Sequence, residues 1–336
     1  MRKSVWQILL VILVLVAVWV LNASRPGATL EGSTPSGPQL PGVQATPDAP
    51  EDAGDEPSEL PSAGEASAKP LRLVSLNVLH GFPRFGDLRQ RLDLIAAGLI
   101  EAEPDVVCLQ EVPWTRALGN GAAYLAERTG YKYLYIRANG NRRTILFEEG
   151  EAILSRYPLH DPAFVQLRPR AGFFEHRMAL HAVVAAPGGD VAVFVTHLTH
   201  GEAQVNAAQA ADLQAFVDET LGAAGTVAGA VICGDFNATA DSPQIRTLTA
   251  TWIDTFRAAQ PNAEGHTCCV DKAALSGALA LEQRLSRRID YVFVRPVSAA
   301  TLVVQDARTL FDAPVAVGND WQWVSDHAGL LVELAP

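Results

Sequence analysis

The sequence predicts an α/β protein in which two mixed β-sheets pack face to face and helices cover the outer faces. From residue 71 onward, short apolar runs of strand length alternate with stretches that have helical spacing. Few of these strands follow one another in strict strand–helix–strand alternation, which favours mixed sheets over one parallel sheet. Hydrophobic residues make up 49% of the 336-residue chain and charged residues 19%, a composition that allows a sizeable buried core.

Ten apolar segments have the length and composition of strands, and turn residues such as Pro-Gly-Gly-Asp at 187–190 separate them. Two of these segments, 105–112 and 229–237, are apolar on both faces, so we expect them to be buried inside their sheets. The predicted strands are 71–78, 105–112, 131–138, 151–157, 178–186, 190–198, 229–237, 288–295, 301–307 and 327–335.

Three stretches have the pattern of helices. Apolar residues recur at helical spacing in the first, at Leu88, Leu92, Ile95 and Leu99. A second helix is predicted from about residue 114 to 129. The third, 203–221, is rich in alanine.

The first 23 residues resemble a membrane anchor or a secretion signal. Arg2 and Lys3 precede an apolar stretch from Val5 to Leu21 that only Gln7 interrupts. The length lies between a signal-peptide core and a full span of roughly 20 residues. Because the basic residues stand at the N-terminus, we expect a cytoplasmic start and an exported remainder. An uncleaved anchor is the main expectation, and a cleaved signal or a buried core helix are the alternatives.

Residues 24–70 are rich in Pro, Gly, Ser and Ala and contain eight acids against Arg25 and Lys69. Such a segment cannot bury enough apolar surface to offset its ordering entropy, so we expect a disordered linker between the membrane and a domain at 71–336. The net charge of the chain is −11, and no basic run stands out in the sequence. Nucleic acid is therefore disfavoured as a partner, without being excluded.

The four cysteines offer no catalytic pattern. Cys108 and Cys233 lie inside apolar runs, where a small buried side chain is the expected role. Cys268 and Cys269 are adjacent and lack the spacing of a metal site. In an oxidising compartment they could form a disulfide bridge, but the sequence identifies no partner for them.

Polar side chains at the ends of apolar strands are the main functional signal. An ionisable group beside a buried strand needs a partner, a metal ion or solvent to offset desolvation. One such residue is commonly a capping or turn residue, whereas a whole set indicates a site, because sites assemble at strand ends in layered α/β folds. The set comprises Asn77, Glu111, His197, Asp235, Asn237, Asp326 and His327.

These stretches resemble the endonuclease/exonuclease/phosphatase superfamily. The motifs LNVLHG, LQEV, AILSRYP, VTHL, GDFN, RIDYVFV and SDH occur in the family's order and cover residues 71–336. GDFN, SDH and an upstream QE together are specific, although each is common alone. The resemblance implies a four-layer α/β sandwich, in agreement with the two packed sheets and outer helices expected above.

The resemblance also implies a divalent metal site. Glu111 looks like the principal ligand, with Asn77 and Asp326 beside the same ion. Oxygen ligands suit Mg²⁺, with Mn²⁺ or Ca²⁺ as alternatives. Leu79 stands where several nucleases of the family carry an aspartate, so the first strand is expected to contribute fewer ligands here.

Catalytic roles are implied for five further residues. Asp235 would orient or deprotonate the attacking water, and Asn237 would hold a phosphoryl oxygen. His327 would pair with Asp290 and face the phosphate, and His197 would donate to the phosphate or the leaving group.

For several side chains near the motifs, the resemblance implies a role less directly. Glu151 is a candidate partner for His197. His80, His176, Arg177 and His200 also lie close to motif segments in the sequence. Among them, Arg177 is the candidate for a contact with phosphate. Aromatic side chains at Phe82, Phe85 and Trp114 are candidates for the rim of an apolar substrate pocket, or for ordinary packing.

The sequence therefore predicts a metal-dependent hydrolase of phosphate esters that acts outside the cytoplasm as a tethered monomer. A lipid headgroup or a small phosphate ester is the favoured substrate, because the domain is acidic and predicted to lie near a membrane. An extracytoplasmic deoxyribonuclease is the alternative. A non-catalytic binding protein on the same fold or a structural membrane protein would not explain the retained polar strand ends.

Overall fold

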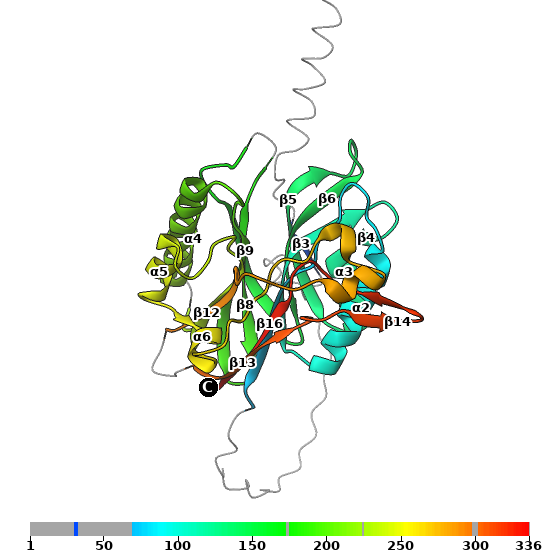
Figure 1. The fold of residues 1–336 in the computed structure, drawn as a ribbon. Coiled ribbons are helices and arrows are strands. Elements are labelled where there is room, and N and C mark those ends of the chain that lie inside the picture. Colours follow the sequence, from blue (N-terminus) through cyan, green and yellow to red (C-terminus); the bar gives the residue numbers. More distant parts are fainter. Residues whose placement is uncertain (1–29, 33–68, 173–174, 224, 298–301, 336) are drawn as a thin grey trace, which may run out of the picture.

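The computed structural model describes residues 30–32, 69–172, 175–223, 225–297 and 302–335, and these form two β-sheets between helices (Figure 1). The predicted anchor at 1–23 and nearly all of the predicted linker lie outside these residues. Within them, no helix is long and apolar enough to cross a membrane.

The first sheet has the strand order β1-β5-β6-β3-β2-β16-β13, with β4 paired to β3. Strands β2 and β3 are parallel neighbours, and β16 is antiparallel to β2. The bounds are β1 Glu31–Gly32, β2 Leu71–Asn77, β3 Val106–Thr115, β4 Gly119–Asn120, β5 Lys132–Asn141, β6 Phe147–Ser155, β13 Val303–Leu310 and β16 Gly329–Ala335.

The second sheet has the order β11-β12-β10-β9-β8-β7, and β14 and β15 form a separate hairpin. In this sheet β9 and β10 are parallel and β12 is antiparallel to β10. The bounds are β7 Leu159–Gln166, β8 Met178–Ala186, β9 Gly189–His197, β10 Gly229–Asp235, β11 Ile253–Asp254, β12 Asp290–Pro296, β14 Val315–Val317 and β15 Asp320–Gln322.

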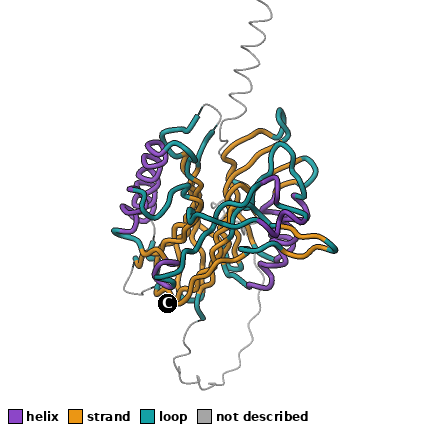
Figure 2. The backbone as a smooth tube through the Cα atoms, in the orientation of Figure 1, coloured by secondary structure: helices purple, strands orange, loops and turns teal. Residues whose placement is uncertain are grey.

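Helices cover the outer face of each sheet (Figure 2). Helices α2 (Leu88–Ala102) and α3 (Gly121–Thr129) pack on the first sheet, and α4 (Ala203–Ala223) and α5 (Pro243–Thr249) on the second. The shorter helices are α6 (Thr255–Ala259), η1 (Lys272–Ala274) and η2 (Ala278–Glu282). The predicted four-layer sandwich is therefore confirmed.

Alternate side chains of each central strand build two cores. In β2, Leu73 points between the sheets, whereas Val74 and Leu76 pack under α2. In β10, Val231 points between the sheets and Ile232 packs against the helices of the other face. Because strands buried on both faces are apolar throughout, their polar residues fall where the strands end.

The second predicted helix starts later than the sequence indicated. Residues predicted as its first turns continue β3 through Thr115 and then form β4. The helix begins at Gly121, where the Asn120 side chain accepts hydrogen bonds from the amides of Ala122 and Ala123. Local capping and pairing of β3 with β6 therefore override the expected start at 114.

Several elements were not predicted from the sequence, among them the strands β1 and β7. Strand β7 has an irregular register between His160 and Ala163, which breaks the two-residue alternation that marks a strand. Strand β1 lies within the segment predicted to be a disordered linker. Its Glu31 accepts a hydrogen bond from Asn120 at 3.1 Å and forms an ion pair with Arg142 at 2.5 Å.

Arg91 on α2 joins the two strand ends of the first sheet that enter the site. Its guanidinium donates to the carbonyls of Val78, Leu79 and Val324 at 2.7–2.9 Å, and its side chain is buried. Burial lowers the pKa of Arg91 to about 10, against the raising influence of Asp326 and Glu111, so it remains charged at neutral pH.

Replacing Arg91 by methionine should destabilise the fold strongly. Arg91→Met leaves three carbonyls without their donor, so we expect the free energy of unfolding to fall by about 3 kcal/mol or more. Urea denaturation measures this change. Arg89→Met, on the exposed side of the same helix, is the control and should cost less than about 1 kcal/mol. Equal effects of the two substitutions would contradict this role of Arg91.

Candidate active site

Asp235, at the end of β10, lies at the centre of the site. In the sheet register it stands opposite His197 of parallel β9 and opposite Asp290 of antiparallel β12. Its Oδ2 is 3.4 Å from His197 Nε2 and 3.7 Å from His327 Nε2. Strand pairing alone therefore brings together residues that are distant in the sequence.

Gly234 permits this close approach of β9 and β10. A Cβ atom at this position would lie 2.1 Å from the carbonyl oxygen of Thr196. Any other residue would force the two strands apart at the end where Asp235 and His197 meet. The glycine of the GDFN motif is therefore needed because no larger residue fits between the two strands.

Asp290 and His327 form a buried pair, as the resemblance implied. His327 Nδ1 is 2.9 Å from Asp290 Oδ2, and both side chains are less than 8% exposed. Burial disfavours the imidazolium, but Asp290 and Asp235 outweigh it and raise the pKa of His327 to about 10. His327 is therefore a cation at neutral pH, with its Nε2 directed toward Asp235.

The surroundings of Asp235 shift the pKa of its carboxyl group upward. Burial and the negative charge of Asp290 raise the pKa of Asp235 to about 7, although His327, the Asn237 amide and the Asn77 side chain counteract them. A carboxyl group with a pKa near neutrality is suited to accept a proton.

His197 and Asn237 contact each other beside Asp235. Asn237 Nδ2 lies 3.0 Å from His197 Nε2 and donates to the carbonyl of Leu198 at 2.9 Å. The Asn237 backbone amide donates to Asp235 Oδ1 at 2.9 Å. Burial, together with Arg177, lowers the pKa of His197 well below its usual value, so the ring is neutral at neutral pH.

A bulge in β3 turns Glu111 into the site. The β3–β6 register shifts between Leu109 and Val112, and Glu111 has a φ of 54°. Bulges of this kind re-aim a side chain, and positive φ values at residues other than glycine gather at functional sites.

The Glu111 carboxylate is held in its ionised form. It lies 3.2 Å from the Nδ2 of Asn77 and 3.4 Å from the Nε2 of His80. Burial alone would raise its pKa, but His80, Lys272 and the hydrogen bond from Asn77 bring the pKa below the usual value.

Asn77 links both sheets, because its Nδ2 also donates to Asp235 Oδ2 at 3.2 Å. The loop before β16 is attached to the same strand end, since Ser325 Oγ donates to the Asn77 carbonyl at 2.6 Å. The neighbouring Asp326 has a side chain that is only 5% exposed. The three predicted metal ligands therefore border one region, although no bond joins Glu111 to Asp326.

This donor set fits a divalent cation of the magnesium type. Glu111, Asp326 and Asn77 offer oxygen atoms and no sulfur, as hard cations require. The carboxylates also need positive charge: Asp326 forms an ion pair with Lys272 at 3.4 Å, and the same lysine lowers the pKa of Glu111.

Glu151 and Arg177 do not take the expected positions. Glu151 forms no hydrogen bond or ion pair with His197 in the part of the chain that the structure describes, so the predicted pairing is wrong. Its Oε2 and His197 Nδ1 are each buried without a partner. Arg177 pairs with Glu175 at 2.5 Å and is otherwise partly buried near Glu149. Its contact with phosphate stays a prediction.

The structure adds contacts for residues to which the sequence analysis assigned no role. Lys272 and Ser325 contact the predicted metal ligands, and His80 and His200 contact Glu111 and Asn237 respectively. Lys272 has no motif around it, so only its rarity could have drawn attention: it is one of four lysines in the chain. His176 bonds to Asn139 instead.

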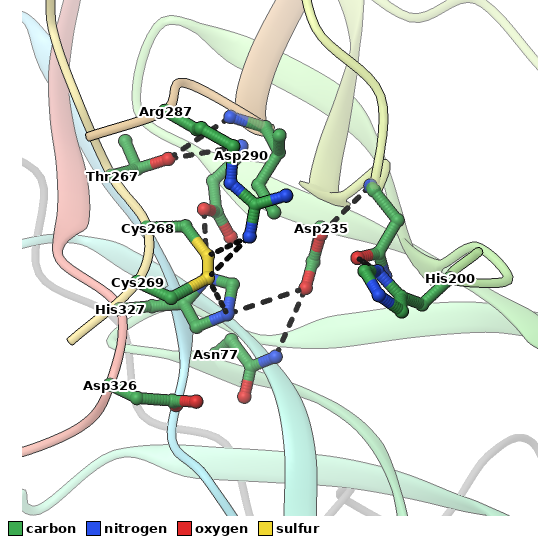
Figure 3. The surroundings of a disulfide bond; sticks show 12 residues. Asn77, His200, Asp235, Thr267, Cys268, Cys269, Arg287, Asp290, Asp326 and His327 are labelled. Atoms are coloured by element: carbon green, nitrogen blue, oxygen red, sulfur yellow. Dashed lines mark hydrogen bonds and ion pairs between the residues drawn. A yellow bond between two sulfur atoms is a disulfide. The ribbon is translucent and has the colours of Figure 1, made fainter. Parts of the chain in front are cut away.

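The adjacent cysteines lie directly beside the pair of Asp290 and His327 (Figure 3). Cys268 and Cys269 form a disulfide with each other, and Cys269 Sγ is 4.0 Å from His327 Nε2. Arg287 Nη2 lies 3.4 Å from Cys269 Sγ. A bridge between neighbouring residues closes almost no loop, so its effect is on local shape rather than on chain entropy.

An aromatic cluster stands next to Glu111. Phe82 stacks on Phe147 with ring centroids 4.6 Å apart, and Phe85 and His80 pack on the same ring. Phe82 is 45% exposed, and its place at the rim of a substrate pocket stays a prediction. Trp114 does not join the cluster and lies under Arg142 instead.

The chain belongs to the endonuclease/exonuclease/phosphatase family, whose model matches residues 74–327. Members of this family are typically metal-dependent hydrolases of phosphodiester bonds. No curated protein matches the sequence significantly.

Solved structures of low sequence identity share the fold. A family protein from Leptotrichia buccalis C-1013-b is 18% identical with a TM-score of 0.59, covering 79% of this chain and 100% of the other. One from Beutenbergia cavernae DSM 12333 is 23% identical with a TM-score of 0.55, covering 80% and 72%. TDP2 from C. elegans is 17% identical with a TM-score of 0.60, covering 81% and 78%.

The protonation of His327 should make its contribution to stability depend on pH. The folded pKa of about 10 lies above that of the unfolded chain, near 6.5. The stabilisation is therefore complete below pH 6.5 and is lost as the pH rises through 10. We expect His327→Gln to lower the melting temperature of the metal-free protein more at pH 6 than at pH 9.5.

Thermal unfolding followed by circular dichroism measures this difference. His266→Gln, in a partly exposed loop, is the control and should have only a small effect on the melting temperature. A His327→Gln effect that does not change between pH 6 and pH 9.5 would contradict the charged pair with Asp290.

Proposed function

We propose that this protein hydrolyses phosphate esters with the help of a divalent metal ion, outside the cytoplasm. The observation that carries the proposal is the convergence of Glu111, Asp235, Asn237 and the Asp290–His327 pair at one edge of the two sheets. The family relationship supports the reaction class.

Each residue has a task that its surroundings favour. Asp235, with its pKa of about 7, accepts the proton of the attacking water. His327, charged by Asp290, faces the phosphoryl oxygens as a cation. Asn237 and neutral His197 supply hydrogen bonds to the phosphoryl group or the leaving oxygen. A metal ion held by Glu111, Asp326 and Asn77 would neutralise developing negative charge.

For the substrate we propose a lipid headgroup or a small soluble phosphate ester. The net charge of −11 disfavours duplex DNA, and the exposed Phe82 beside His80 offers a surface for an apolar portion. Tethering through the N-terminal apolar stretch would hold the domain near a membrane. A deoxyribonuclease is the second candidate, since the family includes enzymes that cut phosphodiester bonds.

Activity assays on the full chain in detergent micelles test this proposal. We expect turnover of bis-p-nitrophenyl phosphate with Mg²⁺, Mn²⁺ or Ca²⁺ and none with EDTA. Asp235→Ala and His327→Ala should each reduce the rate by about 10²–10⁴-fold, because a proton acceptor or a phosphate-facing cation is lost.

Asp161→Asn, an exposed acid on β7, is the matched control and should leave the rate unchanged. Parallel assays with sphingomyelin and plasmid DNA decide between the lipid ester and the nuclease. Activity that persists in EDTA, or that survives both alanine substitutions, would contradict the assigned site.

A further inference from the structure

Lys272 is the cation that stands closest to the predicted metal ligand Asp326. Its Nζ lies 3.4 Å from Asp326 Oδ2. Its ammonium also influences Glu111 and Asp235 electrostatically. Among the described residues it is the only cationic side chain within ion-pair distance of Asp326, whereas Arg91 and His327 interact with this buried carboxylate electrostatically from farther away.

The backbone places Lys272 firmly while the side chain remains free to turn. Val270 donates to the carbonyl of Asp326 at 3.0 Å, and Asp271 caps the turn that begins at Lys272. A small apolar cluster of Val270, Ala280 and Trp323 anchors the segment. The Lys272 side chain itself is 63% exposed. The ammonium can therefore move on its four-carbon stem without disturbing the loop.

Binding of a divalent ion at Asp326 and Glu111 would change the preferred position of the Lys272 ammonium group. Two cations beside one carboxylate repel each other, and the divalent ion has the stronger attraction. The ammonium would then turn toward the nearest remaining negative charge. In a loaded site that charge would be the phosphoryl group, the same group that His327 is proposed to face.

We propose that Lys272 alternates between two partners: Asp326 in the metal-free protein and a phosphoryl oxygen of the substrate in the metal-loaded protein. The proposal rests on the proposed function and assigns a substrate-binding residue to it. An additional cation favours a doubly charged phosphate monoester over a singly charged diester.

The first test measures metal binding without turnover. Titration of the full chain, in detergent micelles, with Mn²⁺ should show about three- to tenfold tighter binding to Lys272→Met than to the wild type, because the competing ammonium is gone. Lys272→Arg, which keeps the charge, should resemble the wild type. Lys132→Met is the matched control: it lies where β5 pairs with the end of β6, away from the site, and should change nothing.

The second test measures phosphate recognition. In the Mn²⁺-loaded protein, Lys272→Met should bind inorganic phosphate about tenfold more weakly. With p-nitrophenyl phosphate its KM should rise about tenfold while kcat stays within about twofold, and the increase should be smaller for bis-p-nitrophenyl phosphate. A lysine with only a structural role would not produce opposite changes in metal and phosphate affinity.

The outcomes separate this proposal from the proposed function. Unchanged Mn²⁺ affinity or unchanged phosphate affinity in Lys272→Met would overturn the role of Lys272, since the contact with Asp326 would then be an ordinary surface ion pair. A wild-type protein that binds Mn²⁺ and phosphate but cleaves no ester would contradict the proposed function, and the two binding measurements would still decide the role of Lys272.

Discussion

Two buried carboxylates that face each other set the main constraint on this structure. Asp235 and Asp290 are paired residues in the β10–β12 ladder, and both side chains are nearly inaccessible to solvent. Two negative charges at such a position are tolerated only if a cation or a proton compensates them. His327 provides the cation, and the raised pKa of Asp235 allows it to hold a proton at moderately acid pH.

The loop before β16 has a conformation that places the His327 cation beside these carboxylates. Ser325 bonds to the end of β2, Arg91 bonds to Val324, and Val270 bonds to Asp326. These contacts hold His327 between the two sheets. The same loop presents Asp326 on the other side, next to the strand end that contributes Asn77. The loop conformation that places His327 beside Asp235 and Asp290 therefore also positions Asp326 at the predicted metal site.

The strand ends could be predicted because each strand is a local pattern. An apolar run followed by a polar residue marks Asn77, His197 and Asp235, and the family motifs supplied Asp290 as the partner of His327. The structure confirms that pairing at 2.9 Å. The fold class was also predictable, since the number and order of apolar segments already require two sheets with helices outside.

Features that depend on contacts between distant segments could not be predicted. Lys272 reaches Asp326 only because the 270–285 segment packs on Trp323, which no local pattern shows. The bulge at Glu111 arises from pairing of β3 with β6. The expected Glu151–His197 pair was wrong because the two side chains come from strands of different sheets, and whether such side chains meet depends on how the sheets pack: Glu151 Oε2 and His197 Nδ1 are each buried without a hydrogen-bond partner.

The position of a bound metal ion tests the assigned active site most directly. Crystals soaked in Mn²⁺ give an anomalous signal that locates the ion without reference to activity. We expect a peak in contact with carboxylate oxygens of Glu111 and Asp326. A peak between Asp235, Asp290 and His327, whose ligand atoms lie within 4.8 Å of one another, would contradict it, because His327 would then serve the metal rather than the phosphate.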